Sequence, residues 1–316
     1  MTGLSPQADG VQSLAALGGR RRDIQGLRAI AVLMVIVFHA DLPVPGGFVG
    51  VDVFFVISGF VITAMLHREW LRAGRIRFRE FYVRRFKRLT PALAVMVSVV
   101  VVTSAIVLSP IGGQAPVVRT ALGAMLLSAN FVAAGSVGGY FDSSAESNPL
   151  LNTWSLSVEE QFYLVFPALL ALGWYAGRRR GTLRFGPISL VAGVTVASFA
   201  LAFASSMGLI FPGSDILLGF YSPFTRAWEF SAGALLALLL ARRTLPDGRA
   251  GSALGVLGLM LLASSLWLIS DATPFPGPWT LLPVTGTLLL LLSGTRATAA
   301  STRLLSTRPM VKIGDW

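Results

Sequence analysis

The sequence predicts an all-α membrane protein, a polytopic bundle of about eight spanning helices with one further segment that re-enters the membrane or lies along its surface. Of the 316 residues, 54% are hydrophobic and only 13% are charged, and the mean hydropathy is +0.70. Basic residues fall in short runs between apolar stretches, as in proteins whose membrane topology is set by positive loops. This composition excludes an ordinary water-soluble globule.

Nine apolar stretches are candidates for spanning helices, and several are shorter than the ~20 residues that a perpendicular helix needs. They cover residues 26–42, 48–66, 91–109, 117–134, 156–173, 187–207, 227–241, 251–269 and 279–293. If all nine span, basic loops alternate between the two sides. If 117–134 does not cross, every basic loop lies on one side, and Arg119, Ser128 and Asn130 interrupt that stretch. We therefore expect eight spans, with an ordinary ninth helix as the alternative.

Residues 1–22 are expected to form a cytoplasmic tail, because the run Arg20–Arg22 precedes the first apolar stretch and no signal-peptide core comes before it. Residues 23–316 then form the membrane domain. The absence of cysteine excludes disulfides and thiolate chemistry, and two histidines, His39 and His67, are too few for a typical zinc site. The net charge of +11 is explained by topology, so nucleic acid is not an expected partner.

Arg28 and His39 stand inside the first apolar stretch, where charged and ionisable side chains are costly. Eleven helical residues make about three turns, so both side chains project from one face, about 16 Å apart. We interpret the pair as functional. The alternative is that Arg28 reaches the headgroups and His39 ends the helix at the opposite interface.

Asp52 follows the first turn between spans and approaches the same membrane side as His39. A carboxylate that accepts the imidazole N–H would fix its tautomer, as a general base requires. A simple N-cap of the second helix is the alternative for Asp52, and the two roles are compatible.

Residues 67–90 carry nine Arg or Lys against two Glu, interleaved with aromatic residues. We expect a basic amphipathic helix on the cytoplasmic surface. Binding to anionic lipid explains most of the charge. Recognition of phosphates is the sharper interpretation, because Arg84 and Arg88 share one helical face with Arg85 beside them.

The stretch NTWSLSVEEQFY enters a later apolar helix with two adjacent carboxylates. Neighbouring helical residues point in different directions, so only one of them readily faces a pocket shared with Asn152 and Trp154, and we favour Glu159 over Glu160. Both could instead be partners of the helix dipole. Farther along, Arg226 and Glu229 are one turn apart, which predicts a local ion pair.

Together these motifs resemble the acyltransferase-3 family of integral membrane acyltransferases. Its Arg-x10-His motif matches Arg28 and His39, its basic element matches residues 84–88, and its WSLSVEEQFY block contributes Trp154, Ser155, Glu159 and Gln161. The amino-acid sequence of these motifs is most similar to that of the branch that carries a C-terminal SGNH-hydrolase-type domain, which this sequence lacks. Family members also continue into further spanning helices beyond VKIGDW, so we expect the membrane domain to lack its last helices.

The resemblance implies an O-acetyltransferase in the cell (inner or cytoplasmic) membrane, with its N-terminus in the cytoplasm and in contact with membrane lipid. It would move an acetyl group from cytosolic acetyl-CoA, or another acyl-CoA, to a hydroxyl of an extracytoplasmic carbohydrate such as lipopolysaccharide, peptidoglycan or exopolysaccharide, without a metal. A separate SGNH-type partner would be compatible with this arrangement.

By the same resemblance, the residues that hold the donor would be Arg28, Arg84, Arg85 and Arg88. The catalytic residues would be His39, Asp52 and Glu159. The residues that bind the acceptor would be Asn152, Trp154 and Ser155. The alternatives are a proton-coupled transporter or flippase, in which Arg28, His39, Asp52 and Glu159 form a pathway, and an inactive remnant of the enzyme.

Overall fold

The structure is a computed structural model that describes residues 21–110, 112–136, 148–179, 181, 185–209, 215–241, 249–295 and 299–315. Every regular element in these ranges is a helix, which confirms the all-α prediction. The N-terminal tail expected over 1–22 lies outside the described residues except for Arg21 and Arg22, as do the basic residues Arg242 and Arg243.

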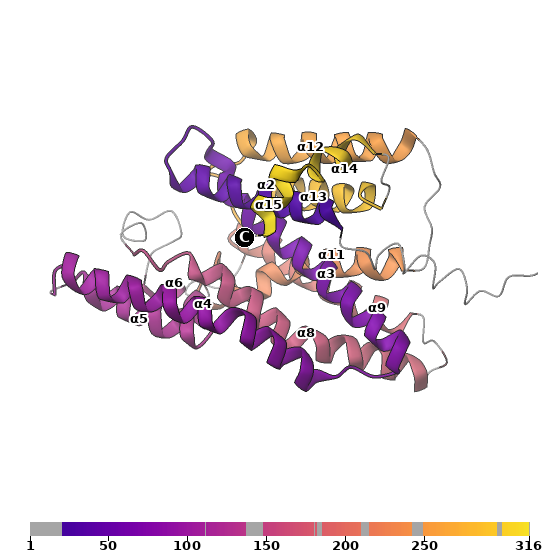
Figure 1. The fold of residues 1–316 in the computed structure, drawn as a ribbon, viewed down its shortest axis with the longest axis horizontal. Coiled ribbons are helices and arrows are strands. Elements are labelled where there is room, and N and C mark those ends of the chain that lie inside the picture. Colours follow the sequence, from indigo (N-terminus) through magenta and orange to yellow (C-terminus); the bar gives the residue numbers. More distant parts are fainter. Residues whose placement is uncertain are drawn as a thin grey trace, which may run out of the picture.

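A helix occupies each of the eight predicted spans (Figure 1). These helices are α2 (Arg22–His39), α3 (Gly50–Ala73), α4 (Phe78–Val107), α8 (Thr153–Arg179), α9 (Gly186–Ser206), α11 (Pro223–Leu240), α12 (Arg249–Leu268) and α13 (Leu281–Ser293). By length and composition, five helical stretches of the described chain can cross a membrane, and Pro278–Ser293 is a shorter apolar helix. The five are Gly47–Ala73, Phe78–Val107, Thr153–Arg179, Gly186–Ser206 and Ala250–Leu268. The protein is therefore a helical membrane bundle.

The ninth apolar stretch is broken in the middle. It forms α5 (Gln114–Met125) and α6 (Ala129–Ser136), and Leu127 between them has a left-handed φ of 56°. The Gln161 side chain of α8 supports the break by donating hydrogen bonds to the Leu127 carbonyl, at 2.7 Å, and to Asn130 Oδ1, at 2.8 Å. Neither piece reaches the ~20 residues of a span, so the alternative of an ordinary ninth helix is wrong.

The separate surface helix expected over residues 67–90 is not formed. Its first part is the end of α3, which stops at Gly74 with a left-handed φ of 65°. Its second part begins α4, which continues through Pro91 into the apolar half of the same helix. Glycine accepts the left-handed conformation without strain and ends the helix there. The basic residues thus form the ends of two long helices.

Helix α3 is the centre of the bundle. Its apolar window is 78% buried, whereas those of α4 and α9 are 17% buried and leave their apolar sides to the surroundings. Close approach of α11 to α3 depends on two glycines: a Cβ on Gly59 would lie 1.8 Å from the Phe230 carbonyl oxygen, and one on Gly233 would lie 2.0 Å from that of Val56. Small residues permit this kind of backbone contact between membrane helices.

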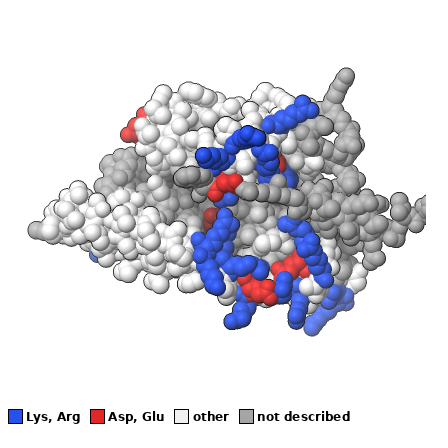
Figure 2. Space-filling model, in the orientation of Figure 1, with Lys and Arg blue, Asp and Glu red and all other residues white. Residues whose placement is uncertain are grey.

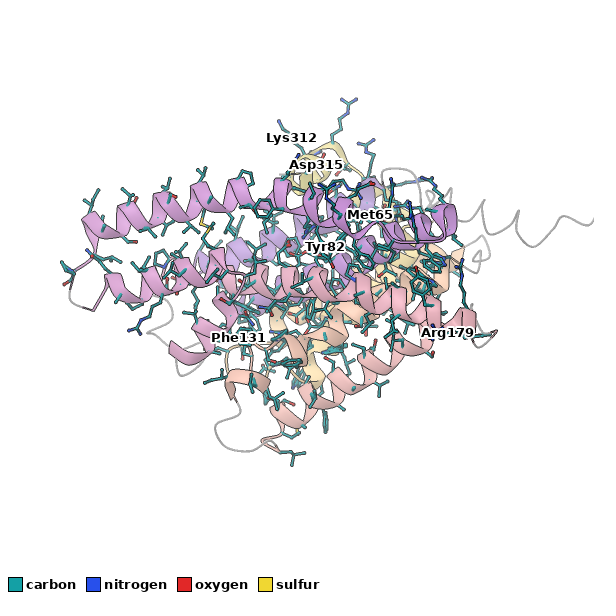
Figure 3. The ribbon with its side chains drawn as sticks, turned by 90° about the horizontal axis from the view of Figure 1, so that it is seen from below. Met65, Tyr82, Phe131, Arg179, Lys312 and Asp315 are labelled. Carbon is teal, nitrogen blue, oxygen red and sulfur yellow. The ribbon has the colours of Figure 1, made fainter. Side chains whose placement is uncertain are left out.

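Short helices complete the described chain: α10 (Asp215–Leu218), α14 (Ala300–Leu305), α15 (Arg308–Asp315) and the 3-10 helices η1 (Pro45–Val49) and η2 (Pro278–Thr280). Helix α15 packs on the start of α2, where a Cβ on Gly314 would meet the Gln25 carbonyl oxygen at 1.8 Å. Figure 3 shows Lys312 and Asp315 of α15 projecting from the edge of the bundle.

Candidate functional site

A cavity of about 760 Å³ lies between α2, α3, α4 and α8. Its walls contain six of the residues that the sequence singled out: Arg28, Arg84, Arg85, Arg88, Ser155 and Glu159. Basic side chains gather on one part of the molecular face in Figure 2, while the part formed by α5 and the end of α4 carries almost none. The structure thus brings the arginine cluster and the WSLSVEEQFY block to one cavity.

The cavity is long, and its arginines come from two helices. On α3 its lining runs from Val51 to Met65, about 21 Å at 1.5 Å per residue. Tyr82 of α4 shares an apolar cluster with Met65, and farther along α4 Arg85 pairs with Glu160 of α8. Arg88 therefore stands about one turn beyond this pair, towards the Val51 end. Arg28 of α2 turns back along its own helix, with its Nη1 3.4 Å from Gln25 Oε1, so the arginines lie along the middle of the cavity.

Glu159 is held on the cavity wall by two hydroxyl groups. Ser58 of α3 and Tyr163 of α8 both donate a hydrogen bond to its Oε1 atom. Arg85 adds a weaker electrostatic contact, with its Nη2 3.9 Å from the same oxygen. The Glu159 side chain is 21% exposed and lines the cavity.

Glu160 forms a buried ion pair and does not line the cavity. Its carboxylate is 7% exposed and pairs with Arg85, whose Nη2 lies 2.7 Å and whose Nε lies 2.8 Å from Glu160 Oε1. The Arg85 guanidinium also lies 3.5 Å from the centroid of the Tyr163 ring. Glu159 lines the cavity and Glu160 does not, but the predicted pocket shared with Asn152 and Trp154 is not formed, because neither residue lines this cavity. Sequence reasoning missed Ser58 and Tyr163, although Tyr163 stands one turn after Glu159, where helical side chains meet.

His39 lies outside the cavity, in an exposed position at the end of α2. Its Nδ1 is 2.7 Å from the Val35 carbonyl oxygen, and its Nε2 is 3.1 Å from Asn152 Oδ1. Because a carbonyl oxygen only accepts, Nδ1 carries the proton and donates to Val35. In the neutral ring Nε2 is then the basic nitrogen, and it bonds Asn152 when the amide is turned so that its nitrogen donates to Nε2. Ser155, on the cavity wall, donates to the Asn152 carbonyl at 3.1 Å, so the start of α8 connects His39 with the cavity.

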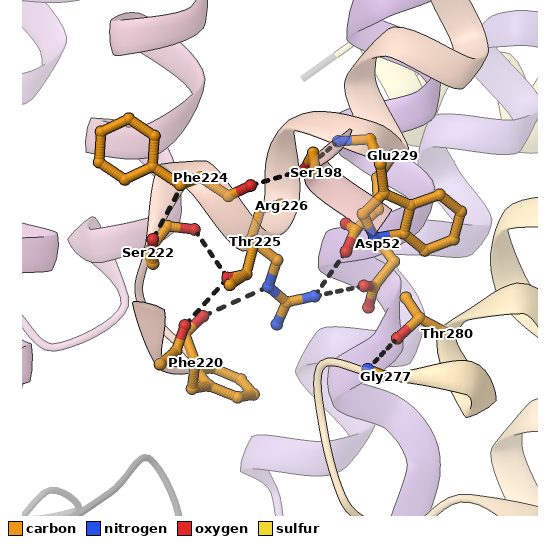
Figure 4. Close-up of polar contacts among 12 residues, drawn as sticks. Asp52, Ser198, Phe220, Ser222, Phe224, Thr225, Arg226, Glu229, Gly277 and Thr280 are labelled. Carbon is orange, nitrogen blue, oxygen red and sulfur yellow. Dashed lines mark hydrogen bonds and ion pairs between the residues drawn. The ribbon is translucent and has the colours of Figure 1, made fainter. Parts of the chain in front are cut away.

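The predicted partnership of Asp52 with His39 is not what the structure shows. Asp52 is buried, and its Oδ1 accepts a 2.5 Å hydrogen bond from Arg226 of α11 (Figure 4). Nor does Asp52 cap its helix, since the N-cap of α3 is Val49, without a side-chain cap. Helical periodicity places Asp52 on a face of α3, but that face turns to α11 and not to α2. Asn152 is the residue that contacts the imidazole.

The predicted pair of Arg226 and Glu229 is confirmed, at 2.9 Å, and it is part of a larger cluster. The same Nη1 atom donates to both Asp52 and Glu229, and all three side chains are at most 1% exposed. The guanidinium lies 4.7 Å from the ring centroid of Phe220 and 4.9 Å from that of Phe275. We name Asp52, Arg226 and Glu229 the buried triad.

Trp154 does not line the cavity either. It is 2% exposed and packs against the rings of Phe55, Phe220 and Tyr221. Of the three residues expected to bind the acceptor, Ser155 therefore lines the cavity, Asn152, which directly precedes α8, contacts His39, and Trp154 packs the start of α8 against its neighbours. Within the described ranges, no three His, Asp or Glu residues are grouped so as to hold a metal ion.

A helical membrane bundle with a cavity lined by four arginines defines an integral membrane protein with a basic cavity. The family profile described as "Acyltransferase domain" matches residues 21–315. The chain belongs to this family of membrane acyltransferases, which confirms the resemblance inferred from its motifs.

Named relatives give the same result. The chain is 34% identical to the peptidoglycan O-acetyltransferase OatA of Listeria monocytogenes, over 68% of this chain and 33% of OatA. It is also 34% identical to YrhL of Bacillus subtilis, whose name assigns it the same activity provisionally, over 73% of this chain and 35% of YrhL. The chain thus spans about a third of the length of the curated relatives it matches. No solved structure matches significantly, and none of these comparisons supports the separate SGNH-type partner.

Proposed function

We propose that this chain transfers an acetyl group from cytosolic acetyl-CoA to a hydroxyl group of an extracytoplasmic glycan, such as peptidoglycan, lipopolysaccharide or exopolysaccharide. The observation that carries the proposal is the cavity, which extends about 21 Å along α3 and is lined by Arg84, Arg85 and Arg88. Its wall also includes Ser155, which donates to the carbonyl of Asn152, the residue in contact with His39. The names of OatA and YrhL support peptidoglycan as the acceptor. Transfer of another acyl group from its coenzyme A thioester would use the same site.

In this proposal the donor phosphates bind Arg84, Arg85 and Arg88, because guanidinium groups recognise phosphate oxygens with paired hydrogen bonds. The slender arm of the donor extends through the cavity towards the Val51 end. Arg28 of α2 lines the same cavity, and its positive charge would stabilise the negative charge that develops on the thioester oxygen during attack.

His39 acts as the general base in the direct form of the reaction. Its Nε2 takes the proton of the acceptor hydroxyl, the hydroxyl oxygen forms a bond to the thioester carbon, and the carbon–sulfur bond breaks. The proton on Nε2 then passes to the thiolate, which leaves as coenzyme A. The hydrogen bond from Nδ1 to the Val35 carbonyl supports this assignment, with the Asn152 amide turned so that its nitrogen, and not its oxygen, faces Nε2. Asn152 is then placed to orient the ring or the acceptor.

The proposed topology places the basic ends of α3 and α4, and the N-terminus, in the cytoplasm of a cell membrane, as the positive-inside bias requires. His39 then faces outwards. The donor and acceptor approach from opposite sides, and neither has to cross the bilayer. The buried triad lies away from the transfer path and positions α3 against α11.

The test measures base-labile acetate on envelope glycans of host cells that express the chain. Acetate above the empty-vector level should disappear in His39→Ala and fall strongly in Arg88→Gln. The matched control is Arg79→Gln, because Arg79 is an exposed arginine of the same helix outside the cavity, and this variant should keep full activity. Equal acetylation in His39→Ala would refute the base, and substrate movement without acetylation would favour the transporter alternative.

A further inference from the structure

The Glu159 carboxylate presents one oxygen to the cavity. Ser58 and Tyr163 both bond Oε1, and among the described residues no donor hydrogen-bonds Oε2. The side chain is 21% exposed, and that exposure opens into the cavity it lines. Oε2 is therefore a charged hydrogen-bond acceptor that the protein itself leaves available.

This acceptor stands about midway along the cavity. Glu159 bonds Ser58, and Ser58 is seven residues from each of Val51 and Met65 on α3, about 10 Å from either end at 1.5 Å per residue. Arg85 lies beside it, with its Nη2 3.9 Å from Glu159 Oε1, and Ser155 is about one turn of α8 farther towards the Val51 end. A ligand whose phosphates contact Arg85 and whose arm extends towards Ser155 passes Glu159.

The surrounding wall is apolar. Ile57, Val61, Ile62 and Leu156 line the cavity on either side of Glu159. A ligand group with an N–H donor would lose its water there without compensation, which is costly unless an acceptor replaces the water. An ordinary lipid tail needs no such acceptor, so the carboxylate selects a ligand whose middle carries hydrogen-bond donors.

We infer that Glu159 Oε2 is the acceptor for an amide N–H in the middle of the donor's arm, and that Ser58 and Tyr163 are positioning residues that aim the carboxylate. This inference rests on the proposed function, because it describes the path of the donor. The arm of coenzyme A fits the chemistry, since it joins its phosphates to its sulfur through secondary amides. The acceptor then distinguishes this arm from a plain hydrocarbon chain.

The experiment compares the affinity of the purified full chain for two probes, coenzyme A and adenosine 3′,5′-bisphosphate, which carries phosphates but no arm. A hydrogen bond to a charged group contributes enough that Glu159→Gln should weaken coenzyme A binding about tenfold. The same variant should not weaken bisphosphate binding, because it removes a negative charge 3.9 Å from Arg85 Nη2. Arg88→Gln should weaken both probes, because it removes a phosphate contact.

Ser58→Ala and Tyr163→Phe provide a second test that remains valid if the Glu159→Gln variant does not fold. Each removes one hydroxyl with little change of shape, and each should weaken coenzyme A severalfold while bisphosphate binding is kept. Unchanged coenzyme A affinity in Glu159→Gln, or an equal loss for both probes, would overturn the amide acceptor. If the wild-type chain binds neither probe, the proposed donor is wrong, and the subsite is rejected with it.

Discussion

Replacing Arg226 with methionine should be one of the most damaging single changes in the bundle. Arg226 Nη1 donates to Asp52 at 2.5 Å and to Glu229 at 2.9 Å, and all three side chains are at most 1% exposed. Two carboxyl groups and one guanidinium are neutral only if one carboxyl carries a proton, and a buried net charge is costly. Arg226→Met leaves both carboxyl groups without a cation, and loss of one member of a buried ion pair costs about 3–5 kcal/mol of unfolding free energy.

Glu229→Gln is the informative comparison, because it keeps the shape of the side chain and leaves one guanidinium facing one carboxylate. We expect it to cost no more than about 1 kcal/mol, the net value of an ordinary hydrogen bond. The assay is the free energy of unfolding of detergent-purified protein, measured by titration with a denaturing detergent. The reasoning is refuted if Arg226→Met stays within about 1 kcal/mol of the wild type, or if Glu229→Gln is equally destabilising.

Further predictions concern packing and charge, and the same unfolding measurement checks them. Gly59→Ala should cost about 1–3 kcal/mol, because its Cβ would lie 1.8 Å from a carbonyl oxygen of α11. Gly193→Ala, a matched change in α9 with nothing within 4 Å, should be neutral or slightly stabilising, and equal effects would contradict the packing argument. Glu160→Gln should cost about 1–3 kcal/mol, because it weakens the pairing of buried Glu160 with Arg85. Glu80→Gln, in a surface pair with Arg77, should change stability by less than about 1 kcal/mol, and a larger loss there than in Glu160→Gln would refute this ranking.

Hydropathy and charge predicted the helices well, because the bilayer demands long apolar stretches and basic loops whatever the tertiary contacts are. The broken ninth stretch was also predictable, since Ser128 and Asn130 interrupt it. Helix geometry indicated that only one of Glu159 and Glu160 readily faces a pocket, but it did not predict the pairing of Glu160 with Arg85. These features depend on residues that are close together in the sequence.

Contacts between distant helices were not predictable in the same way. Periodicity indicates which face of α3 carries Asp52, but not that α11 covers that face, so the partner was assigned to His39 instead of Arg226. Ser58 looked like an ordinary small residue in an apolar helix until the structure placed it against Glu159. The prediction of a surface helix over residues 67–90 was wrong for a local reason. The charged ends of α3 and α4 together resemble one amphipathic segment, but the chain turns between them at Gly74.

The start of α2 has a consequence for the order in which the bundle is assembled. Arg21 donates a 2.9 Å hydrogen bond to the carbonyl of Leu291, which is 270 residues farther along the chain. During synthesis this contact cannot form until nearly all other helices have entered the membrane. Arg21 also pairs with Asp23, two residues away, so its charge has a local partner from the beginning. The charge of Arg21 can therefore be neutralised by Asp23 after α2 has entered the membrane and before α13 is inserted beside it.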